Sequence, residues 1–398
     1  MSNDELYAGR EQTLVKHFIL QKYLERFAYK VGSHWDTLTY VDCFSGPWNA
    51  RSEVFEDSSF AIALKQLRNA RDTLAEQRGR NVRLRCFFLE KNRAAYARLK
   101  EFADSVTDAK IETRNATLEE SVPEITDYVQ RGGAKDFPFI FIDPTGWTGF
   151  GMETIAPLLR LNPSEVLINF MTGHIRRFLE SPQEETQDSF KRLFGSGSFR
   201  EKIEGMAQQN REDAAVQEYT RNAKIIGGFN FGCSAIVLNP EKDRTHFNLI
   251  YLTRRPEGVE VFKETEKKAM EVQETARADA HKRKREARTG QLDLLGSKEL
   301  HDSSHFESLR ERYLAKARGL VLQALESKHR LLYDDAWTLA MSEPMSWESD
   351  LKQWIEEWKE EGQLEVVGMQ PRRRVPRRGE ANYLIWKTMT PLNPPSPA

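Results

Sequence analysis

The stretch PFIFIDPTGW, residues 138–147, is the most apolar run of the chain and ends in Asp143, Pro144 and, after a short turn, Trp147. Apolar residues that follow one another without alternation, and that turn-forming residues then interrupt, are typical of a strand buried on both faces of a parallel sheet. The stretch therefore predicts a central strand whose carboxyl end carries polar groups. Ligands of open parallel sheets bind at that end of the strands.

Runs of the same kind lie on both sides of this strand and alternate with helical patterns. The predicted strands are TLTYVDCFSG (37–46), NVRLRCFFLEKN (81–92), KIETRNA (110–116) and EVLINF (165–170). The predicted helices cover 11–30, 58–77, 93–104, 117–131 and 152–161. This alternation indicates βαβ units and a mostly parallel sheet. Two further runs, FGCSAIVLNP (231–240) and THFNLIYLTRRP (245–256), predict a hairpin that adds an antiparallel edge.

A change of composition toward the C-terminus predicts a second domain. Residues 257–290 have the pattern of a long charged helix, and polar residues follow to about 305. With 398 residues, the chain is long enough for two or three domains. We predict a Rossmann-like α/β domain over 1–275, the end of the charged helix and a linker over 276–305, a second domain over 306–390 and a disordered tail over 391–398.

The predicted second domain consists of three helical runs followed by a hairpin. The helical runs cover 306–326, 333–342 and 346–361, and the hairpin strands are QLEVVG (363–368) and ANYLIWK (381–387). Three helices and a hairpin with a charged tip are the layout of a winged-helix domain, in which the third helix usually enters a nucleic-acid groove.

The charge of these elements limits how this domain could bind nucleic acid. The third helix, SWESDLKQWIEEWKEE, is strongly acidic and poorly suited to phosphates. The hairpin loop is basic, and its residues predicted to contact nucleic acid are Arg372, Arg373, Arg374, Arg377 and Arg378. Protein docking or dimerisation is an equal alternative for this domain. A second basic run, HKRKREAR (281–288), is explained at least as well by a solvated helix face.

The composition indicates a soluble, cytoplasmic protein. No run of 18 apolar residues could span a membrane, and the first residues, MSNDELYAGREQ, lack the apolar core of a secretory signal. Cys43, Cys86 and Cys233 lie far apart in apolar, strand-like runs. Because they show neither metal-ligand spacing nor a disulfide framework, we expect reduced structural thiols and no metal site. The net charge of −1 neither favours nor excludes a nucleic-acid partner.

The ends of three predicted strands carry groups that suit a nucleoside cofactor. The first strand ends in a tight turn with a glycine, which lets the backbone approach a ligand closely. Glu90, after the second strand, could accept hydrogen bonds from a ribose diol, with Lys91 and Asn92 beside the adenine. Asn115 and Ala116, after the third strand, could meet the adenine edge. The predicted cofactor-binding residues are Asp42, Phe44, Ser45, Gly46, Glu90, Lys91, Asn92, Asn115 and Ala116.

Three of these residues also have an explanation outside a ligand site: Asp42, Asn115 and, as a merely solvent-exposed carboxylate, Glu90. A turn or helix-capping role explains Asp42 equally well, and a role outside a ligand site is slightly favoured for Asn115. The apolar strand before Glu90 fixes that carboxylate at the edge of the sheet. The order of the three signals along three strands predicts an S-adenosylmethionine site in a sheet of the methyltransferase type.

Asp143, Pro144 and Trp147 form the pattern expected of an enzyme that methylates an amino group. The lone pair of an aromatic amine is delocalised, so the amine is a poor nucleophile. Hydrogen bonds from its N–H groups to Asp143 and to the carbonyl of Pro144 would favour the pyramidal, nucleophilic form. Trp147 would stack on the base. The alternative is an Asp-Pro turn that closes the strand, with Trp147 in the core.

Several runs together resemble the three-Cys-motif partner protein family over roughly residues 10–275. They are KHFILQKYLERF (16–27), DCFSGP (42–47), FLEKN (88–92), FIDPTGW (141–147) and HFNLIYLTRRPEG (246–258). The residues that match the family pattern are Asp42, Phe44, Gly46, Glu90, Asp143, Pro144, Gly146 and Trp147. The resemblance implies a methyltransferase-like bacterial protein whose gene neighbours one for a protein with a three-cysteine motif, similar to iron–sulfur radical enzymes.

The chain departs from the family pattern around its first turn. Trp48 stands where the family usually has a second glycine, and Asp57-Ser58-Ser59 replaces the Gly-Ser-Pro that often opens the next helix. The interval from Asp42 to Glu90 also exceeds the roughly 20 residues expected between a glycine-rich turn and its acidic partner. These departures concern cofactor binding rather than the fold.

The combined prediction is an S-adenosylmethionine-dependent methyltransferase that acts on an amino group, with a nucleobase of DNA or RNA as the favoured substrate. In a duplex, that base would have to be flipped out. The alternative is a methyltransferase-like accessory protein that works with an iron–sulfur, three-Cys-motif partner without turnover of its own. A small-molecule or protein methyltransferase is a third possibility. His17, His174 and His246 could line the pocket, although each is more often a core or surface residue.

Overall fold

The computed structural model describes residues 6–46, 50–53, 55–146, 148–178, 183–195, 199, 203, 205–290 and 301–387. The chain separates into two compact units, Met1–Ser303 and Ser304–Ala398. The long charged helix predicted over 257–290 is present as α11 (Pro256–Thr289). Because α11 belongs to the first unit throughout its length, that unit extends past the boundary at residue 275 that composition suggested.

A seven-stranded sheet forms the centre of the first unit. Its strands are β1 (Thr37–Asp42), β2 (Arg83–Leu89), β3 (Lys110–Arg114), β4 (Asp136–Ile142), β5 (Glu165–Phe170), β6 (Phe231–Leu238) and β7 (Thr245–Thr253). They lie in the order β3-β2-β1-β4-β5-β7-β6. Pairing is parallel from β3 to β5, whereas β7 is antiparallel to both β5 and β6. The predicted α/β class with an antiparallel hairpin is confirmed, and the arrangement fits a Rossmann-like methyltransferase fold.

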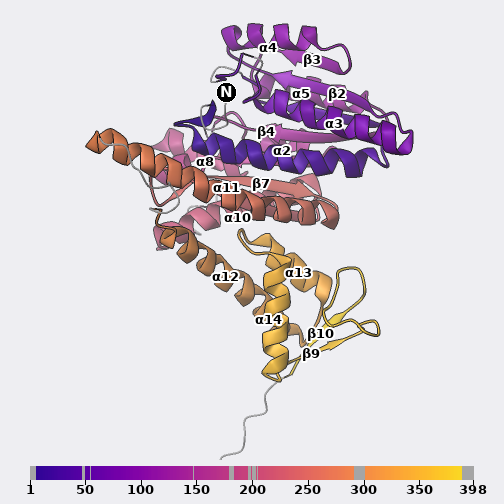
Figure 1. Cartoon of the computed structure of the whole chain (residues 1–398), viewed down its shortest axis with the longest axis vertical. Helices are drawn as coiled ribbons and strands as arrows, with labels where there is room; N and C mark the ends of the chain where they lie inside the picture. Colours follow the sequence, from indigo (N-terminus) through magenta and orange to yellow (C-terminus); the bar gives the residue numbers. More distant parts are fainter. Residues whose placement is uncertain are drawn as a thin grey trace, which may run out of the picture. The chain divides into compact units, whose positions relative to one another are not determined.

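Helices cover both faces of this sheet (Figure 1). Besides α11, they are α2 (Glu11–Gly32), α3 (Ser59–Arg78), α4 (Arg93–Ser105), α5 (Leu118–Gln130), α6 (Met152–Leu159), α7 (Thr172–Phe178), α8 (Glu184–Phe194) and α10 (Gln208–Gly227). Val41, Ile140 and Ile168 pack with apolar residues of α5, α6 and α10. Tyr40 and Phe139, which alternate with them along the strands, lie on the opposite face, under α2.

An aromatic cluster fixes α2 on the sheet. The ring of Tyr23 lies 5.6 Å from that of Phe139 and 4.9 Å from that of Tyr251. The Tyr23 hydroxyl also donates a hydrogen bond of 2.6 Å to the buried carboxylate of Glu165, whose pKa is raised by burial. Lys16 precedes Tyr23 by two helical turns and therefore projects from the same side of α2 toward the sheet.

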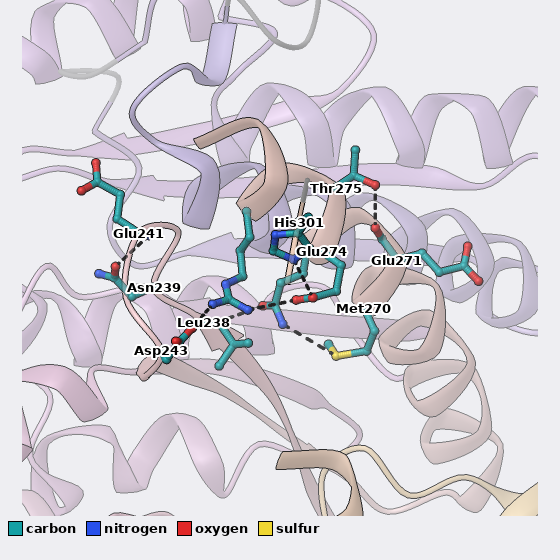
Figure 2. A network of polar contacts seen from close by, with 11 residues as sticks. Leu238, Asn239, Glu241, Asp243, Met270, Glu271, Glu274, Thr275 and His301 are labelled. Carbon is teal, nitrogen blue, oxygen red and sulfur yellow. Dashed lines mark hydrogen bonds and ion pairs between the residues drawn. The ribbon is translucent and has the colours of Figure 1, made fainter. Parts of the chain in front are cut away.

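A polar network attaches α11 to the turn between β6 and β7 (Figure 2). The guanidinium of Arg277 is buried and forms ion pairs with Asp243 of the turn and with Glu274 on its own helix. On its other side, Glu274 Oε2 lies 3.0 Å from Nε2 of His301. A buried guanidinium with two carboxylate partners holds its neighbours in one geometry, so the network orders this end of the first unit.

The basic run 281–288 lies on α11 and is largely paired. Arg283 forms an ion pair with Glu11, and Lys284 forms one with Glu241. These contacts favour the interpretation of the run as a solvated, ion-paired helix face.

The second unit contains three helices and a small antiparallel sheet. In chain order, its elements are α12 (Ser304–Lys328), β8 (Arg330–Leu332), α13 (Tyr333–Ser342), α14 (Glu348–Glu360), β9 (Leu364–Val367) and β10 (Tyr383–Trp386). The sheet has the order β8-β10-β9. The three helices and the hairpin agree with the sequence prediction, whereas β8 was not predicted. Three residues are too few for a strand periodicity to be visible.

The three cysteines are free and buried. Burial raises the pKa of the thiols of Cys86 and Cys233 to about 12 and that of Cys43 well above its ordinary value, so all three are protonated near neutral pH. Within the described ranges, no three His, Cys, Asp or Glu side chains are grouped to hold a metal ion. No helix among those residues has both the length and the apolar character needed to cross a membrane.

Candidate functional site

The strand order reverses between β1 and β4. From β1 the chain proceeds to β2 and β3 on one side, and from β4 it proceeds to β5 on the other. Such a switch point opens a crevice beyond the carboxyl ends of the strands, where open α/β sheets bind their ligands. Asp42 is the last residue of β1, and Asp143 follows β4 directly. The two carboxylates thus lie at the position where this fold binds ligands.

Strand register places the predicted acidic residues on one face of the sheet. Asp42 is paired with Phe88 of β2 and with Phe141 of β4. Because side chains alternate along a strand, Glu90 and Asp143, each two residues further on, project from the same face as Asp42. Helices α2 and α3 cover this face. Accordingly, Asp143 forms an ion pair with Lys16 of α2, and Asp42 accepts a hydrogen bond from Ser59 of α3.

The carboxylate of Asp42 is fully buried and bonded to protein donors. Its Oδ1 accepts the N–H of Phe44 at 3.1 Å, and its Oδ2 accepts the hydroxyls of Ser59 at 2.5 Å and Tyr40 at 3.3 Å. Burial raises its pKa to about 6, with a further increase from the negative charge of Asp143, although the bonds from Ser59 and Phe44 oppose the shift. Asp42 therefore shapes the turn and holds the start of α3, the structural role that the sequence left open. Direct contact with a cofactor stays a prediction for this residue.

The turn after β1 is bonded to the strands on both sides. The N–H of Cys43 donates to the carbonyl of Phe141 at 2.9 Å, and the N–H of Ser45 donates to that of Leu89 at 2.8 Å. The Ser45 hydroxyl donates to the carbonyl of Asp42 at 2.9 Å, and Phe44 packs against the apolar core. These bonds hold the turn at the edge of the sheet as far as Ser45. Pro47, Trp48 and Asn49 lie outside the described residues.

Asp42 leads to a pH prediction for stability. Since its folded pKa of about 6 exceeds the ordinary value of 3.8, its contribution to stability is full below pH 3.8 and is lost as the pH rises through 6. The stability difference between the variant and the wild type is the free energy of unfolding of Asp42→Asn minus that of the wild type. We expect this difference to increase by about 2 kcal/mol between pH 4.5 and 7.5. Urea unfolding of the full chain, with equal m-values required for both proteins, measures this difference. Parallel pH profiles of the two proteins would contradict the assignment.

Glu90 is held at the end of β2 by its own turn. Its N–H donates to the carbonyl of Arg114 at 3.1 Å, and its Oε1 accepts the N–H of Asn92 at 2.6 Å. Burial raises the pKa of Glu90, while the bond from Asn92 and the charge of Lys91 oppose the shift. The carboxylate therefore has a fixed position at the sheet edge from which it could accept hydroxyl groups.

The neighbours of Glu90 take mainly structural roles. Asn92 caps α4, because its side-chain oxygen accepts the N–H groups of Ala94 and Ala95 at 3.0 Å each. The amide of Asn115 donates to the carbonyls of Glu90 at 2.7 Å and of Lys91 at 3.1 Å, which ties the end of β3 to the end of β2. Lys91 is exposed, and Ala116 is partly buried against the core. These contacts join the ends of β2 and β3, and the side-chain oxygen of Asn92 already accepts two N–H groups. A role in cofactor binding stays a prediction for these residues.

Asp143 is bonded to two nitrogen donors. Its Oδ1 accepts the side-chain amide of Asn169 at 2.7 Å, and its Oδ2 forms an ion pair with the ammonium of Lys16. The side chains of Lys16 and Asp143 are 13% and 14% exposed, so this pair is only slightly accessible to water. Pro144 is buried, and Trp147 lies outside the described residues. The stacking role predicted for Trp147 stays a prediction.

Sequence patterns did not single out Lys16 or Asn169 as site residues. Asn169 is the only polar side chain between Glu165 and the end of the strand EVLINF, and a buried amide within a strand is a detectable sign of a polar partner. Lys16 belongs to an amphipathic helix in which a lysine is unremarkable, and only the packing of α2 shows that it reaches the sheet edge. Its role could not be inferred from periodicity.

The segment before α2 and the loop before α3 are linked next to the site. Arg10 forms an ion pair of 2.6 Å with Asp57, which also accepts the N–H groups of Arg51 at 2.9 Å and Ser52 at 3.2 Å. Burial alone would raise the pKa of Asp57, but these hydrogen bonds outweigh burial and lower it. The loop is thus fastened to the start of α2.

Of the three histidines considered from the sequence, His17 has described contacts in the core. His17 is buried and bonded to the hydroxyl of Tyr7 at 2.9 Å, and burial lowers its pKa well below the ordinary value. His246 is half-buried and follows the start of β7, and the side chain of His174 is not among those described. For His17 the core interpretation therefore holds.

Comparisons with known proteins add little to this geometry. The sequence matches no protein-family model and no curated protein. Among solved structures, a Legionella pneumophila protein described by the family model DUF519 is similar at 12% identity and a TM-score of 0.36, over 63% of this chain and 87% of that one. A loganic acid methyltransferase with S-adenosylhomocysteine is similar at 7% identity and a TM-score of 0.30, over 67% and 83%. At these TM-scores neither likeness bears on activity, and the resemblance to three-Cys-motif partner proteins stays a prediction.

Proposed function

We propose that this chain is an S-adenosylmethionine-dependent methyltransferase that acts on an amino group, with a nucleobase of DNA or RNA as the favoured substrate. The observation that carries the proposal is the environment of Asp143 at the switch point of the sheet. This carboxylate accepts N–H groups from a primary ammonium, that of Lys16, and from the amide of Asn169. A slightly accessible carboxylate that already binds two nitrogen donors is chemically suited to hold an amino group.

The residues at the ends of β1 and β2 fit the cofactor. Glu90 presents a fixed carboxylate for the ribose hydroxyls, and Phe44 and Ala116 offer partly buried apolar surface nearby. Together with Asp42 and Asp143, Glu90 makes this edge acidic, which complements the sulfonium and the amino group of S-adenosylmethionine. When bound, the cofactor supplies an activated methyl group.

Asp143 would act on the substrate by orientation. By accepting an N–H of the target amine, it directs the nitrogen lone pair and stabilises the positive charge that develops on that nitrogen. The Pro144 carbonyl is the proposed second acceptor from the sequence pattern. Lys16 must leave Asp143 when the amine binds, and its long flexible side chain permits this movement.

The second unit is proposed to bind nucleic acid as a winged-helix-like domain. Its order of helix, strand, helix, helix, strand and strand supports that assignment. Of the five predicted contact residues, Arg372, Arg374 and Arg377 are exposed in the loop between β9 and β10. The other two are engaged within the unit, since Arg373 pairs with Glu380 and Arg378 lies over the ring of Trp337. Phosphate contacts are therefore proposed for the three exposed arginines first.

An accessory role without turnover is the second candidate. It is favoured by Trp48, which stands in the sequence where the family pattern has a second glycine, and by the acidic helix α14. Incubation with labelled S-adenosylmethionine and mixed DNA and RNA separates the two candidates. Label in nucleic acid supports the enzyme. Cofactor binding without label, together with co-purification of an iron–sulfur protein, supports the accessory role.

Calorimetry with S-adenosylmethionine tests the cofactor site through Glu90. We expect Glu90→Gln to weaken binding about 10- to 100-fold, because a neutral amide replaces a carboxylate that accepts the ribose hydroxyls. Gln retains an oxygen for the N–H of Asn92, so the turn should persist. Glu101→Gln, at an exposed position of α4, is the matched control and should bind as the wild type does. No binding heat from the folded wild type would remove the proposed function.

A further inference from the structure

Asn169 carries an unused hydrogen-bond acceptor beside Asp143. The residue is 3% exposed at the carboxyl end of β5. Its Nδ2 donates to Asp143 Oδ1 at 2.7 Å and lies 3.5 Å from Met171 Sδ. Its Oδ1 is buried and has no hydrogen-bond partner among the described residues. Buried amide oxygens are rarely left without a donor, so this atom requires an explanation.

The orientation of the Asn169 amide follows from its partner. An ionised carboxylate can only accept hydrogen bonds, so the NH2 end of the amide must face Asp143. Exchanging the two ends would place an amide oxygen against a carboxylate oxygen. The unused acceptor is therefore the amide oxygen, Oδ1.

The two acceptors are close enough for one amino group to reach both. Since Asn169 Nδ2 lies 2.7 Å from Asp143 Oδ1 and shares one planar amide with Asn169 Oδ1, the two Oδ1 atoms are at most about 5 Å apart. The two N–H groups of an NH2 diverge, and with ordinary hydrogen bonds their acceptors stand about 5 Å apart. Lys16, which now pairs with Asp143, is the neighbouring group with the freedom to move aside.

We propose that Asn169 Oδ1, in place of the Pro144 carbonyl that the sequence pattern suggested, accepts one N–H of the substrate's amino group while Asp143 accepts the other. This inference rests on the proposed function and narrows its substrate class to exocyclic NH2 groups. A keto oxygen has no proton to donate and would meet two acceptors. A monomethylated amine has only one N–H left, so the product binds more weakly than the substrate and a second methylation is disfavoured.

Binding of nucleobase probes to the full chain saturated with S-adenosylhomocysteine tests the inference. The probes are 9-methyladenine, its N6-methyl derivative and 9-methylpurine, and a parallel series is built on 1-methylcytosine. We expect the wild type to bind the NH2 probe of one series about tenfold more tightly than its N-methyl form, the ordinary effect of one lost hydrogen bond. 9-Methylpurine has no amino group and is no larger than 9-methyladenine. Because it donates neither N–H, it should bind even more weakly than the N-methyl probe.

Asn169→Leu removes the acceptor at nearly constant volume and should reduce the preference for NH2 over N-methyl to within about twofold. Met171→Leu is the matched control, because it removes the sulfur that contacts Asn169 Nδ2 but leaves Asn169 Oδ1 in place. This variant should keep the wild-type preference for NH2 over N-methyl. An unchanged preference in folded Asn169→Leu would overturn the inference.

Measurements on the wild type keep the inference testable should Asn169→Leu fail to fold. Equal affinities for the NH2, N-methyl and unsubstituted probes would overturn it. So would the absence of binding by either NH2 probe to protein that binds S-adenosylhomocysteine. By contrast, failure of S-adenosylmethionine itself to bind contradicts the proposed function as a whole, and the two outcomes are thus distinguishable.

Discussion

Asp143→Leu is expected to lower the rate of methyl transfer at saturating substrate by about 10²- to 10³-fold, the usual effect of removing one positioned electrostatic group. Leucine has a similar volume but accepts no N–H, so the amine loses the group that orients its lone pair. Labelled methyl incorporation into the nucleic acid that the wild type modifies measures this rate. The affinity for S-adenosylmethionine, measured by calorimetry, should change little, because the cofactor is assigned to the ends of β1 and β2.

A control is needed because Asp143→Leu also leaves Lys16 without its partner. The double variant Lys16→Met and Asp143→Leu removes both charges of this pair and should be as inactive as the single variant while regaining stability. Lys16→Met alone should stay active, since Lys16 only occupies the acceptor in the absence of an amine. Full activity of Asp143→Leu would show that Asp143 is not the acceptor of the substrate.

Arg85→Met is expected to lower the free energy of unfolding by about 3–5 kcal/mol, because it leaves a charge buried without its partner. Arg85 forms an ion pair of 2.8 Å with Asp136, whose side chain is 2% exposed, and donates to the carbonyl of Tyr128 at 2.6 Å. Burial raises the pKa of Asp136, and the hydroxyl of Thr39 and the charge of Arg85 oppose the shift. Urea unfolding of the full chain at pH 7.5 measures the loss.

Two comparisons identify the cause of that loss. The double variant Arg85→Met and Asp136→Leu removes both buried charges and should recover most of it. Arg114→Met breaks a pair with Glu124 in which both side chains are well exposed, at 55% and 41%, and should cost less than about 1 kcal/mol. If Arg85→Met lowers the free energy of unfolding no more than Arg114→Met does, the buried charge of Asp136 does not need Arg85 as its partner.

The strand ends were the part of the site that the sequence could predict. Apolar runs define where each strand stops, and in a parallel sheet all such ends meet at one edge. Glu90 and Asp143 were located in this way, and the register of β1, β2 and β4 puts them on one face with Asp42. The alternation of side chains along each strand and the order of the strands are sufficient to place these three carboxylates together.

The roles of individual side chains at that edge were less predictable. Asp42 and Asn92 proved to be bonded to the turn and to the start of a helix, because a buried acceptor takes the nearest backbone donors. Two of the five loop arginines, Arg373 and Arg378, have partners inside the second unit. Local spacing cannot distinguish an acceptor that a ligand will use from one that the backbone already uses.

The sequence by itself determined the α/β class, the antiparallel hairpin and the polar ends of the strands, since these depend on hydrophobic periodicity within short segments. The tertiary structure alone decided that Lys16 and Asn169 meet at Asp143. These three residues come from α2, from β5 and from the end of β4, and are brought together only when the aromatic cluster of Tyr23 fixes α2 on the sheet. A contact between residues distant in sequence depends on the packing of whole elements, which no local pattern encodes.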